Sequence, residues 1–424
     1  MDLPTQRGQA GHDQAATTPS CVPPHHFISV SQSYILKYIE KGGMLSVKIV
    51  VAPDSFKGSI SARDICLKVR QGVHKVLPGA EVIEIPLADG GEGTMENMIF
   101  SSNGTKKQVE VTGPLGHKIR AEYGVLGDHK TAVIEMAQAS GLTLLKDHER
   151  NPMVTTSFGT GELIKAALDN GYRKFIIGIG GSATNDAGMG MLKALGVNFY
   201  GKDGNPLSEG GASLIDLDHF DDSHLDSRIK QSKIIVASDV TNTICGPKGA
   251  SAVFGPQKGA TPEMVKKLDE AINHFADVVH NQKSVDIRQL TGGGAAGGIG
   301  AALITFLGAE LQSGIQVIME ALHFEDAIKE ADLIITGEGR LDSQTLSGKL
   351  ISGVSKLAKK YDVPVIALCG GLNIDMTELD ELGLLSAFSI VPGPCTLDDA
   401  IKDAPIWIPE RVEAIMRIIN YQWT

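Results

Sequence analysis

Short apolar runs that each end at a turn carrying a carboxylate constrain the fold of this chain most strongly. The runs are Val47–Ala52, Val82–Ala88, Phe175–Ile179, Ile234–Ala237 and Leu333–Thr336. Because Ile and Val dominate them and polar residues do not alternate with apolar ones, each is predicted to be a buried strand of a parallel sheet. The acids that follow are Asp54, Asp89, Asp186, Asp239 and Glu338. Open α/β sheets bind ligands outside the carboxyl ends of their strands, so these acids predict an enzyme with a metal–phosphate site at that edge.

Length, charge and cysteine usage exclude several classes of protein. A chain of 424 residues exceeds one hydrophobic core, which predicts two domains. A net charge of −11 argues against a nucleic-acid surface, although it allows one nucleotide whose charge Mg²⁺ neutralises. The 5 cysteines are scattered without the spacing of a zinc site, which is typical of a cytoplasmic protein. No apolar run approaches the ~18 residues that a membrane span requires, so we expect no membrane partner.

The order of the predicted elements suggests one domain interrupted by another. Residues 1–43 lack a signal-peptide pattern and are interpreted as a leader, either disordered or a non-native extension before Met44. Residues 44–105 and 290–424 alternate strands with helices and are expected to form one α/β domain. Residues 106–289 begin with three short strands that resemble an antiparallel meander and are expected to form an inserted second domain. The active site is expected in the cleft between the two domains.

The turns after the first two strands are candidate binding loops. Asp54, Ser55 and Lys57 follow the first strand, where a carboxylate and an ammonium group can meet a charged substrate. The alternative is a capping Asp beside a solvated Lys. The second turn contains Asp89, Gly90, Gly91 and Glu92 before a predicted helix. Backbone N–H groups at a helix start favour anions, and the acids can hold a metal or a hydroxyl, although capping alone would also use them.

The segment from Gly178 to Gly188 resembles the G-x-G-x-x-A fingerprint of dinucleotide-binding folds. An NAD(P)-dependent oxidoreductase acting on a small hydroxy acid is therefore the alternative enzyme class. The fingerprint is weak because no acid is clearly placed at the end of the next strand. Thr184, Asn185 and Asp186 instead suit contacts to a hydroxyl group or a metal near a phosphate.

Three further motifs remain open between a functional and a structural role. Asp239 ends a strand and can accept the proton of a substrate hydroxyl, or it can simply form a turn. The second motif contains Gly292, Gly293 and Gly294. These glycines can cradle phosphate through backbone N–H groups, or they can allow close packing or act as a hinge. Glu338 and Arg340 follow another strand and add the one well-placed arginine.

Many separate motifs, in order from about Met44, closely resemble the type I glycerate kinase family. They include VVAPDSFKGS, PLADGGEGT, VTGPLG, IEMAQASGL, TTSFGTGELI, GIGGSATNDAGMGML, SDVTN, FGPQKGA, GGGAAGGIGAAL and TGEGRLDSQTLSGK. One departure is Thr243, where the family pattern has a proline. The resemblance implies phosphorylation of D-glycerate by ATP with Mg²⁺, by a two-domain α/β enzyme. It also implies that the larger domain is Rossmann-like or flavodoxin-like, with a parallel sheet, and that the smaller inserted α/β domain closes on it.

The resemblance also implies roles for individual residues. Asp239 would be the general base, and Asp54, Lys57 and Asp89 would line the glycerate and phosphoryl site. Thr184, Asn185 and Asp186 would complete the site, with Asp186 and Asp89 as candidate Mg²⁺ ligands. The product is expected to be 2-phosphoglycerate, with 3-phosphoglycerate as an alternative. A solute-binding protein that closes over a small acid is a third possibility, and a homodimer is left open.

Overall fold

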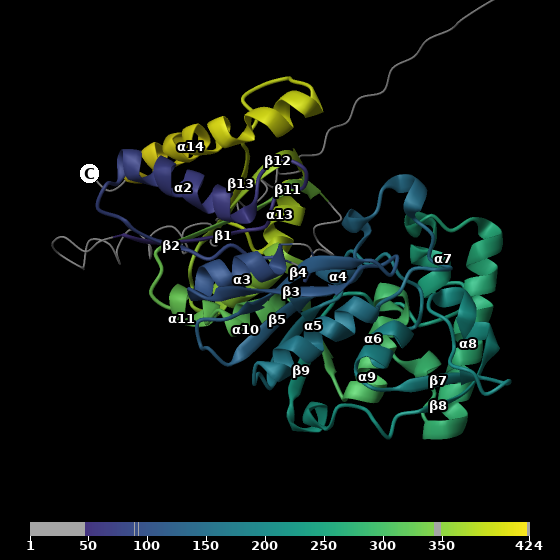
Figure 1. The fold of residues 1–424 in the computed structure, drawn as a ribbon. Coiled ribbons are helices and arrows are strands. Elements are labelled where there is room, and N and C mark those ends of the chain that lie inside the picture. The colour runs from purple at the N-terminus through teal and green to yellow at the C-terminus, as the bar shows by residue number, and fades with distance from the viewer. Residues whose placement is uncertain (1–46, 89, 92, 343–348, 422–424) are drawn as a thin grey trace, which may run out of the picture. The chain divides into compact units, whose positions relative to one another are not determined.

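The computed structural model describes residues 47–88, 90–91, 93–342 and 349–421, and of Lys349 its backbone only (Figure 1). The predicted leader and the candidate residues Asp89 and Glu92 lie outside the described residues. Described residues up to Asn420 form one compact unit. None of the helices in the described ranges combines the length and apolar character needed to cross a membrane.

The first sheet has five parallel strands in the order β13-β12-β11-β1-β2. Its strands are β1 (Lys48–Pro53), β2 (Glu81–Glu84), β11 (Leu333–Asp342), β12 (Val365–Asn373) and β13 (Ser386–Ser389). The first strand of the chain therefore lies inside the sheet, between β11 and β2, as in doubly wound α/β folds. The predicted α/β fold with parallel strands is confirmed.

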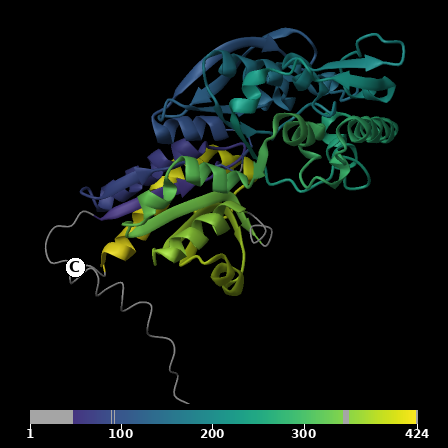
Figure 2. The ribbon, with the colours of Figure 1, turned by 90° about the horizontal axis from the view of Figure 1, so that it is seen from below.

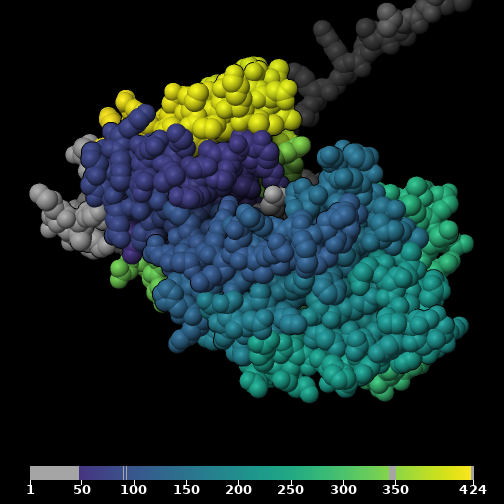
Figure 3. Space-filling view, viewed as in Figure 1, coloured from purple at the N-terminus to yellow at the C-terminus, as the bar shows by residue number. Residues whose placement is uncertain are grey.

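The helices of this part of the fold are amphipathic and bury one side each. They are α2 (Ala62–Val76), α3 (Thr94–Ser102), α10 (Gly314–Ala321), α11 (Phe324–Ile328), α12 (Lys349–Lys360), α13 (Met376–Leu382) and α14 (Leu397–Tyr421). Helix α2 begins as predicted, because the Ser61 side chain accepts a hydrogen bond from the Asp64 backbone N–H. Helices α2 and α14 lie side by side, in purple and yellow, in Figure 1, Figure 2 and Figure 3. Their close packing covers part of the first sheet.

The second sheet has six strands in the order β10-β9-β6-β5-β4-β3. Its strands are β3 (Thr105–Thr112), β4 (Lys118–Val125), β5 (Thr131–Glu135), β6 (Lys174–Gly178), β9 (Lys233–Ala237) and β10 (Glu310–Gln312). The pairs β3–β4 and β4–β5 are antiparallel, which confirms the predicted meander, and the remaining pairs are parallel. A separate hairpin pairs β7 (Asn198–Gly201) with β8 (Leu217–Asp221).

The helices of this part enclose the larger hydrophobic cluster of the chain. They are α4 (Ala137–Ser140), α5 (Phe158–Asp169), α6 (Met189–Ala194), α7 (Ala250–Phe254), α8 (Pro262–Lys283) and α9 (Ile299–Leu307). Buried aromatic and aliphatic side chains from α5, α6, α8 and α9 pack in one cluster with residues of β5, β6 and β9. Gly171, with φ of 89°, follows the end of α5 as predicted.

The five predicted strands all occur and all pair in parallel. They belong to two sheets, since β1, β2 and β11 lie in the first and β6 and β9 in the second. One expectation about them was wrong, because the second predicted run is not a buried strand throughout: β2 ends at Glu84, and its residues are half-buried or exposed because it is an edge strand. The predicted domain boundaries at residues 106 and 289 stay a prediction. The second sheet also includes β10, which lies after residue 289 and ends at Gln312.

Candidate functional site

The loop after β2 brings strand ends of both sheets together. It starts beside β1, where the Leu87 backbone N–H donates to the Pro53 carbonyl at 2.9 Å. Gly90 has φ of +92°, and a Cβ there would lie 2.9 Å from the Ala237 carbonyl oxygen at the end of β9. A Cβ on Gly180, just after β6, would lie 2.9 Å from the Gly91 Cα. Side chains would block these approaches, so the glycines let the loop reach the ends of β6 and β9.

A pocket of about 350 Å³ lies where these segments meet. Backbone of Gly90, Gly91, Gly180 and Gly181 lines it, together with the side chains of Ser182, Asp239 and Lys258. Asp239 is half-buried and follows β9 by two residues. The predicted position of Asp239, at a strand end beside the glycine-rich loops, is therefore what the structure shows. A carboxylate, a hydroxyl and an ammonium group on one small wall can bind a small polar molecule through several hydrogen bonds.

Lys258 is the functional candidate that reasoning from the sequence missed. Its residue is only 1% exposed, and its Nζ donates to Ser182 Oγ at 2.7 Å and to the Thr184 carbonyl at 2.6 Å. Burial lowers the pKa of Lys258 to about 7, and the negative charge of Asp186 opposes this shift. A signal was available, because the FGPQKGA segment was part of the resemblance although no role was given to its lysine.

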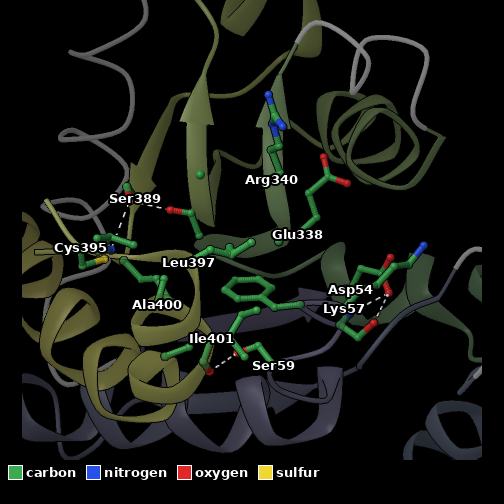
Figure 4. Close-up of a pocket in the computed structure, with 18 of the residues that line it drawn as sticks. Asp54, Lys57, Ser59, Glu338, Arg340, Ser389, Cys395, Leu397, Ala400 and Ile401 are labelled. Atoms are coloured by element: carbon green, nitrogen blue, oxygen red, sulfur yellow. Dashed lines mark hydrogen bonds between the residues drawn. The ribbon is translucent and has the colours of Figure 1, made fainter. Parts of the chain in front are cut away.

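A second, larger pocket of about 890 Å³ lies at the carboxyl ends of β1, β11, β12 and β13. Figure 4 shows Asp54 and Lys57 on one side of it and Glu338 and Arg340 on another. Asp54 and Lys57 lie in the predicted turn after β1, whereas Glu338 and Arg340 lie within β11, because this strand continues past its predicted end at Thr336 to Asp342. Its remaining wall is mostly apolar. The apolar side chains include Phe56, Leu350, Ile351, Leu397 and Ile401.

The turn after β1 is held in a defined conformation. The Asp54 backbone N–H donates to the Gly337 carbonyl at 2.8 Å, which ties the turn to β11. Asp54 Oδ1 in turn accepts from the Ser55 backbone N–H at 2.7 Å. Across the pocket, Arg340 forms an ion pair with Asp342 at 2.9 Å, yet its side chain stays 71% exposed. A fixed carboxylate therefore faces a pocket that two cationic side chains also border.

Thr184, Asn185 and Asp186 are fully buried and line neither pocket. Asp186 Oδ2 accepts from the Ser157 N–H at 2.9 Å, the Ser157 hydroxyl at 2.8 Å and the Gly190 N–H at 3.2 Å. Its Oδ1 accepts from the Gly188 N–H at 3.1 Å. Burial raises the pKa of Asp186 despite these donors. The contacts suit a residue that positions the start of α6 better than one that meets a ligand.

The glycines at 292–294 are buried and are not part of either pocket wall. A Cβ on Gly294 would lie 2.1 Å from the Thr243 carbonyl, and one on Gly292 would lie 2.3 Å from the Leu311 side chain. Gly293 is less tightly enclosed, with the Leu290 carbonyl 3.0 Å from its Cβ position. These contacts favour the close-packing role over the phosphate cradle, and only the later Ala295 and Ala296 reach the small pocket.

Comparison with known proteins identifies the relatives of this chain. A model of the glycerate kinase family matches residues 49–420. The chain is 50% identical to a glycerate kinase of Bacillus subtilis (strain 168) over 358 residues, which cover 84% of this chain and 94% of the relative. It is 49% identical to a glycerate 2-kinase of Escherichia coli (strain K12) over 358 residues, again 84% and 94% of the two chains. These matches give no support to the oxidoreductase alternative.

A solved structure shows the same fold. The crystal structure described as glycerate kinase 2 from Salmonella typhimurium LT2 aligns with a TM-score of 0.81 and 48% sequence identity. The alignment covers 89% of this chain and 99% of that one.

Proposed function

Because this chain belongs to the glycerate kinase family, we propose that it uses ATP and Mg²⁺ to phosphorylate the 2-hydroxyl of D-glycerate. The family match over residues 49–420, joined to a small polar pocket that contains Asp239, is the observation that carries this proposal. The 2-hydroxyl is preferred because a relative at 49% identity is named a glycerate 2-kinase. Phosphorylation of the 3-hydroxyl is the alternative.

Size and polarity suggest which substrate enters which pocket. The pocket of about 890 Å³ has an apolar wall that suits an adenine nucleoside and a charged rim that suits its phosphates. The pocket of about 350 Å³ is more polar and suits a three-carbon hydroxy acid. The segment after β2 starts beside β1, whose end carries Asp54, and continues to the small pocket at Gly90 and Gly91. The segment therefore connects β1, whose following turn borders the larger pocket, with the wall of the small pocket.

The residues of the larger pocket fit a nucleotide-bound magnesium ion. Mg²⁺ is usually held by one or two carboxylates together with substrate phosphates, and Asp54 and Glu338 offer such carboxylates. Within the described ranges no group of 3 or more His, Cys, Asp or Glu residues could by itself hold a metal ion. When bound, Mg²⁺ would neutralise phosphate charge. Lys57 and Arg340 would contact phosphate oxygens from the same rim.

The proposed chemistry is in-line transfer assisted by a general base. Asp239 accepts the proton of the glycerate hydroxyl as that oxygen forms a bond to the γ-phosphorus. The bond between the γ-phosphorus and the bridging oxygen breaks, and ADP leaves. Backbone N–H groups in the glycine-rich loops are candidates for stabilising the developing charge. The alternative place for Mg²⁺, on Asp186, is less favourable because that carboxylate already accepts four hydrogen bonds.

An ADP-release assay with MgATP and D-glycerate tests this proposal, and phosphorus NMR of the product locates the phosphate. We expect ADP formation that depends on D-glycerate, with the coupling pattern of 2-phosphoglycerate. A folded protein that binds ATP but releases no ADP with D-glycerate would contradict the proposed acceptor. We further propose a cytoplasmic location, where ATP is supplied, while a homodimer stays a prediction.

A further inference from the structure

We propose that the ammonium group of Lys258 binds the carboxylate of the acceptor substrate and so selects hydroxy acids over uncharged polyols. This inference rests on the proposed function, and it assigns a substrate-recognition role to a residue outside the predicted site. It also fixes the direction of the acceptor in the small pocket, with its carboxylate at Lys258 and its hydroxyl at Asp239.

Lys258 is unusual for a lysine because its ammonium group lies inside the protein. It ends the short 3₁₀ helix Pro256–Lys258 and is followed by Gly259, which has φ of +90° and lies against Arg150 backbone. This turn directs the side chain inward, where Nζ reaches Ser182 Oγ and the Thr184 carbonyl. An ammonium group has three N–H donors, and these two contacts use two of them. Among the described residues Nζ has no third hydrogen-bond partner, so its third donor can serve a molecule in the pocket that Lys258 and Ser182 line.

The charges around this pocket match a hydroxy acid. Among the described lining residues, Lys258 is the cationic group and Asp239 the anionic one. Asp186, which lies behind the wall, is the other charged group whose influence reaches Lys258. A carboxylate entering a small pocket beside Asp239 would be repelled unless a cation paired with it. Lys258 supplies that cation, and its charge-assisted hydrogen bond would be strong because the lysine itself is buried.

The lowered pKa supports this arrangement. With a pKa of about 7, a fraction of the enzyme carries a neutral Lys258 at neutral pH when no ligand is present. A bound carboxylate favours the charged form and raises that pKa. Binding of D-glycerate should therefore take up protons above pH 7 and weaken as the pH rises. Binding of glycerol, which lacks the carboxylate, should take up none.

Calorimetric titration of the full chain with D-glycerate and with glycerol tests the inference. Lys258→Met keeps the length of the side chain without its charge, and Lys266→Met is the control because Lys266 lies on α8 with an 81% exposed side chain. We expect Lys258→Met to weaken D-glycerate binding by roughly 10- to 100-fold, the scale of a hydrogen bond to a charged group, with ATP binding unchanged. Lys266→Met should leave both affinities as in the wild type.

Proton uptake provides a second readout that needs no variant at Lys258. Wild-type titrations at pH 7.5 in two buffers of different ionisation enthalpy should show uptake with D-glycerate only. Equal D-glycerate affinity in folded Lys258→Met, or loss of kcat alone with unchanged affinity, would overturn the inference and indicate a role toward the phosphoryl group or the fold.

The outcomes separate this inference from the proposed function. Wild-type protein that binds D-glycerate with proton uptake but forms no ADP would refute the kinase assignment and leave the role of Lys258 supported. ADP formation by the wild type, together with normal D-glycerate affinity in Lys258→Met, would support the kinase assignment and refute the role of Lys258. Lys258→Arg, which keeps the charge, is expected to retain discrimination against glycerol; loss of discrimination in a folded Lys258→Arg that binds ATP normally would count against recognition by charge.

Discussion

Among single residues, Asp239 and Asp186 are both acids after strands of the second sheet, yet their surroundings assign them different roles. Asp239 lines the small pocket, so Asp239→Asn should lower kcat by about 10²- to 10⁴-fold, the usual scale for a general base, with little change in melting temperature. Steady-state ADP release measures this, and Asp218→Asn on the exposed face of β8 is the matched control. A folded Asp239→Asn with near-normal kcat would remove Asp239 from that role.

Asp186→Asn should instead act mainly on stability. Its carboxylate accepts hydrogen bonds from Ser157, Gly188 and Gly190, and an amide replaces one acceptor oxygen by a donor. Leaving buried donors unsatisfied typically costs about 1–3 kcal/mol each, so urea unfolding should show a loss of at least that size. The affinity for Mg²⁺ in the presence of ATP should stay unchanged. A stable Asp186→Asn with weakened Mg²⁺ binding would instead support the metal-ligand role expected from the sequence.

Lys258 also predicts how stability depends on pH. Because the folded state lowers its pKa from about 10.5 to about 7, folding is favoured by the neutral form. The contribution of neutral Lys258 to the free energy of unfolding is largest above the unfolded-state pKa. It is lost as the pH falls from about 10 to about 7. The free energy of unfolding of the unliganded wild type, minus that of Lys258→Met, should therefore rise by up to a few kcal/mol over this range. A flat difference in urea titrations would show that the lysine stays charged.

At the scale of elements, the contact between α2 and α14 depends on Gly72. A Cβ there would lie 2.7 Å from the Pro409 carbonyl and 2.7 Å from the Val412 Cβ. Gly72→Ala should therefore lower the free energy of unfolding by about 1–3 kcal/mol through overpacking, although alanine favours a helix. Gly79→Ala is the control, because a Cβ at Gly79 meets nothing within 4 Å. A more stable Gly72→Ala would mean that the two helices move apart at little cost.

Elements were easier to predict from the sequence than their assembly. The runs before Asp54 and Asp239 are apolar enough to identify buried strands, and Ser61 marks the start of α2 by its cap. Which strands share a sheet depends on pairings between segments far apart in the chain, so periodicity does not reveal it. The same limit applied to the site. Lys258 and Asp186 both lie in motifs of the resemblance and both are buried. Only the tertiary contacts show that the lysine borders a pocket and the aspartate does not.

For the whole molecule, the strongest consequence of the proposal is that two substrates occupy two separate pockets. The larger is formed by turns of the first sheet and the smaller by strand ends of the second together with Gly90 and Gly91. A ligand that binds only the folded state stabilises it by about 2.7 kcal/mol at 100 times its Kd. ATP and D-glycerate should therefore each raise the melting temperature, and together they should raise it by at least the sum of the two shifts.

Asp239→Asn is the suitable protein for this measurement, because slow turnover keeps both substrates intact during a thermal scan. If the substrates competed for one pocket, saturation with one would abolish the shift from the other, and the assignment of two pockets would be wrong. A shift larger than the sum would mean that each substrate favours a conformation that binds the other more tightly. That result is expected if the loop after β2, which borders the small pocket and starts beside β1, responds to both substrates.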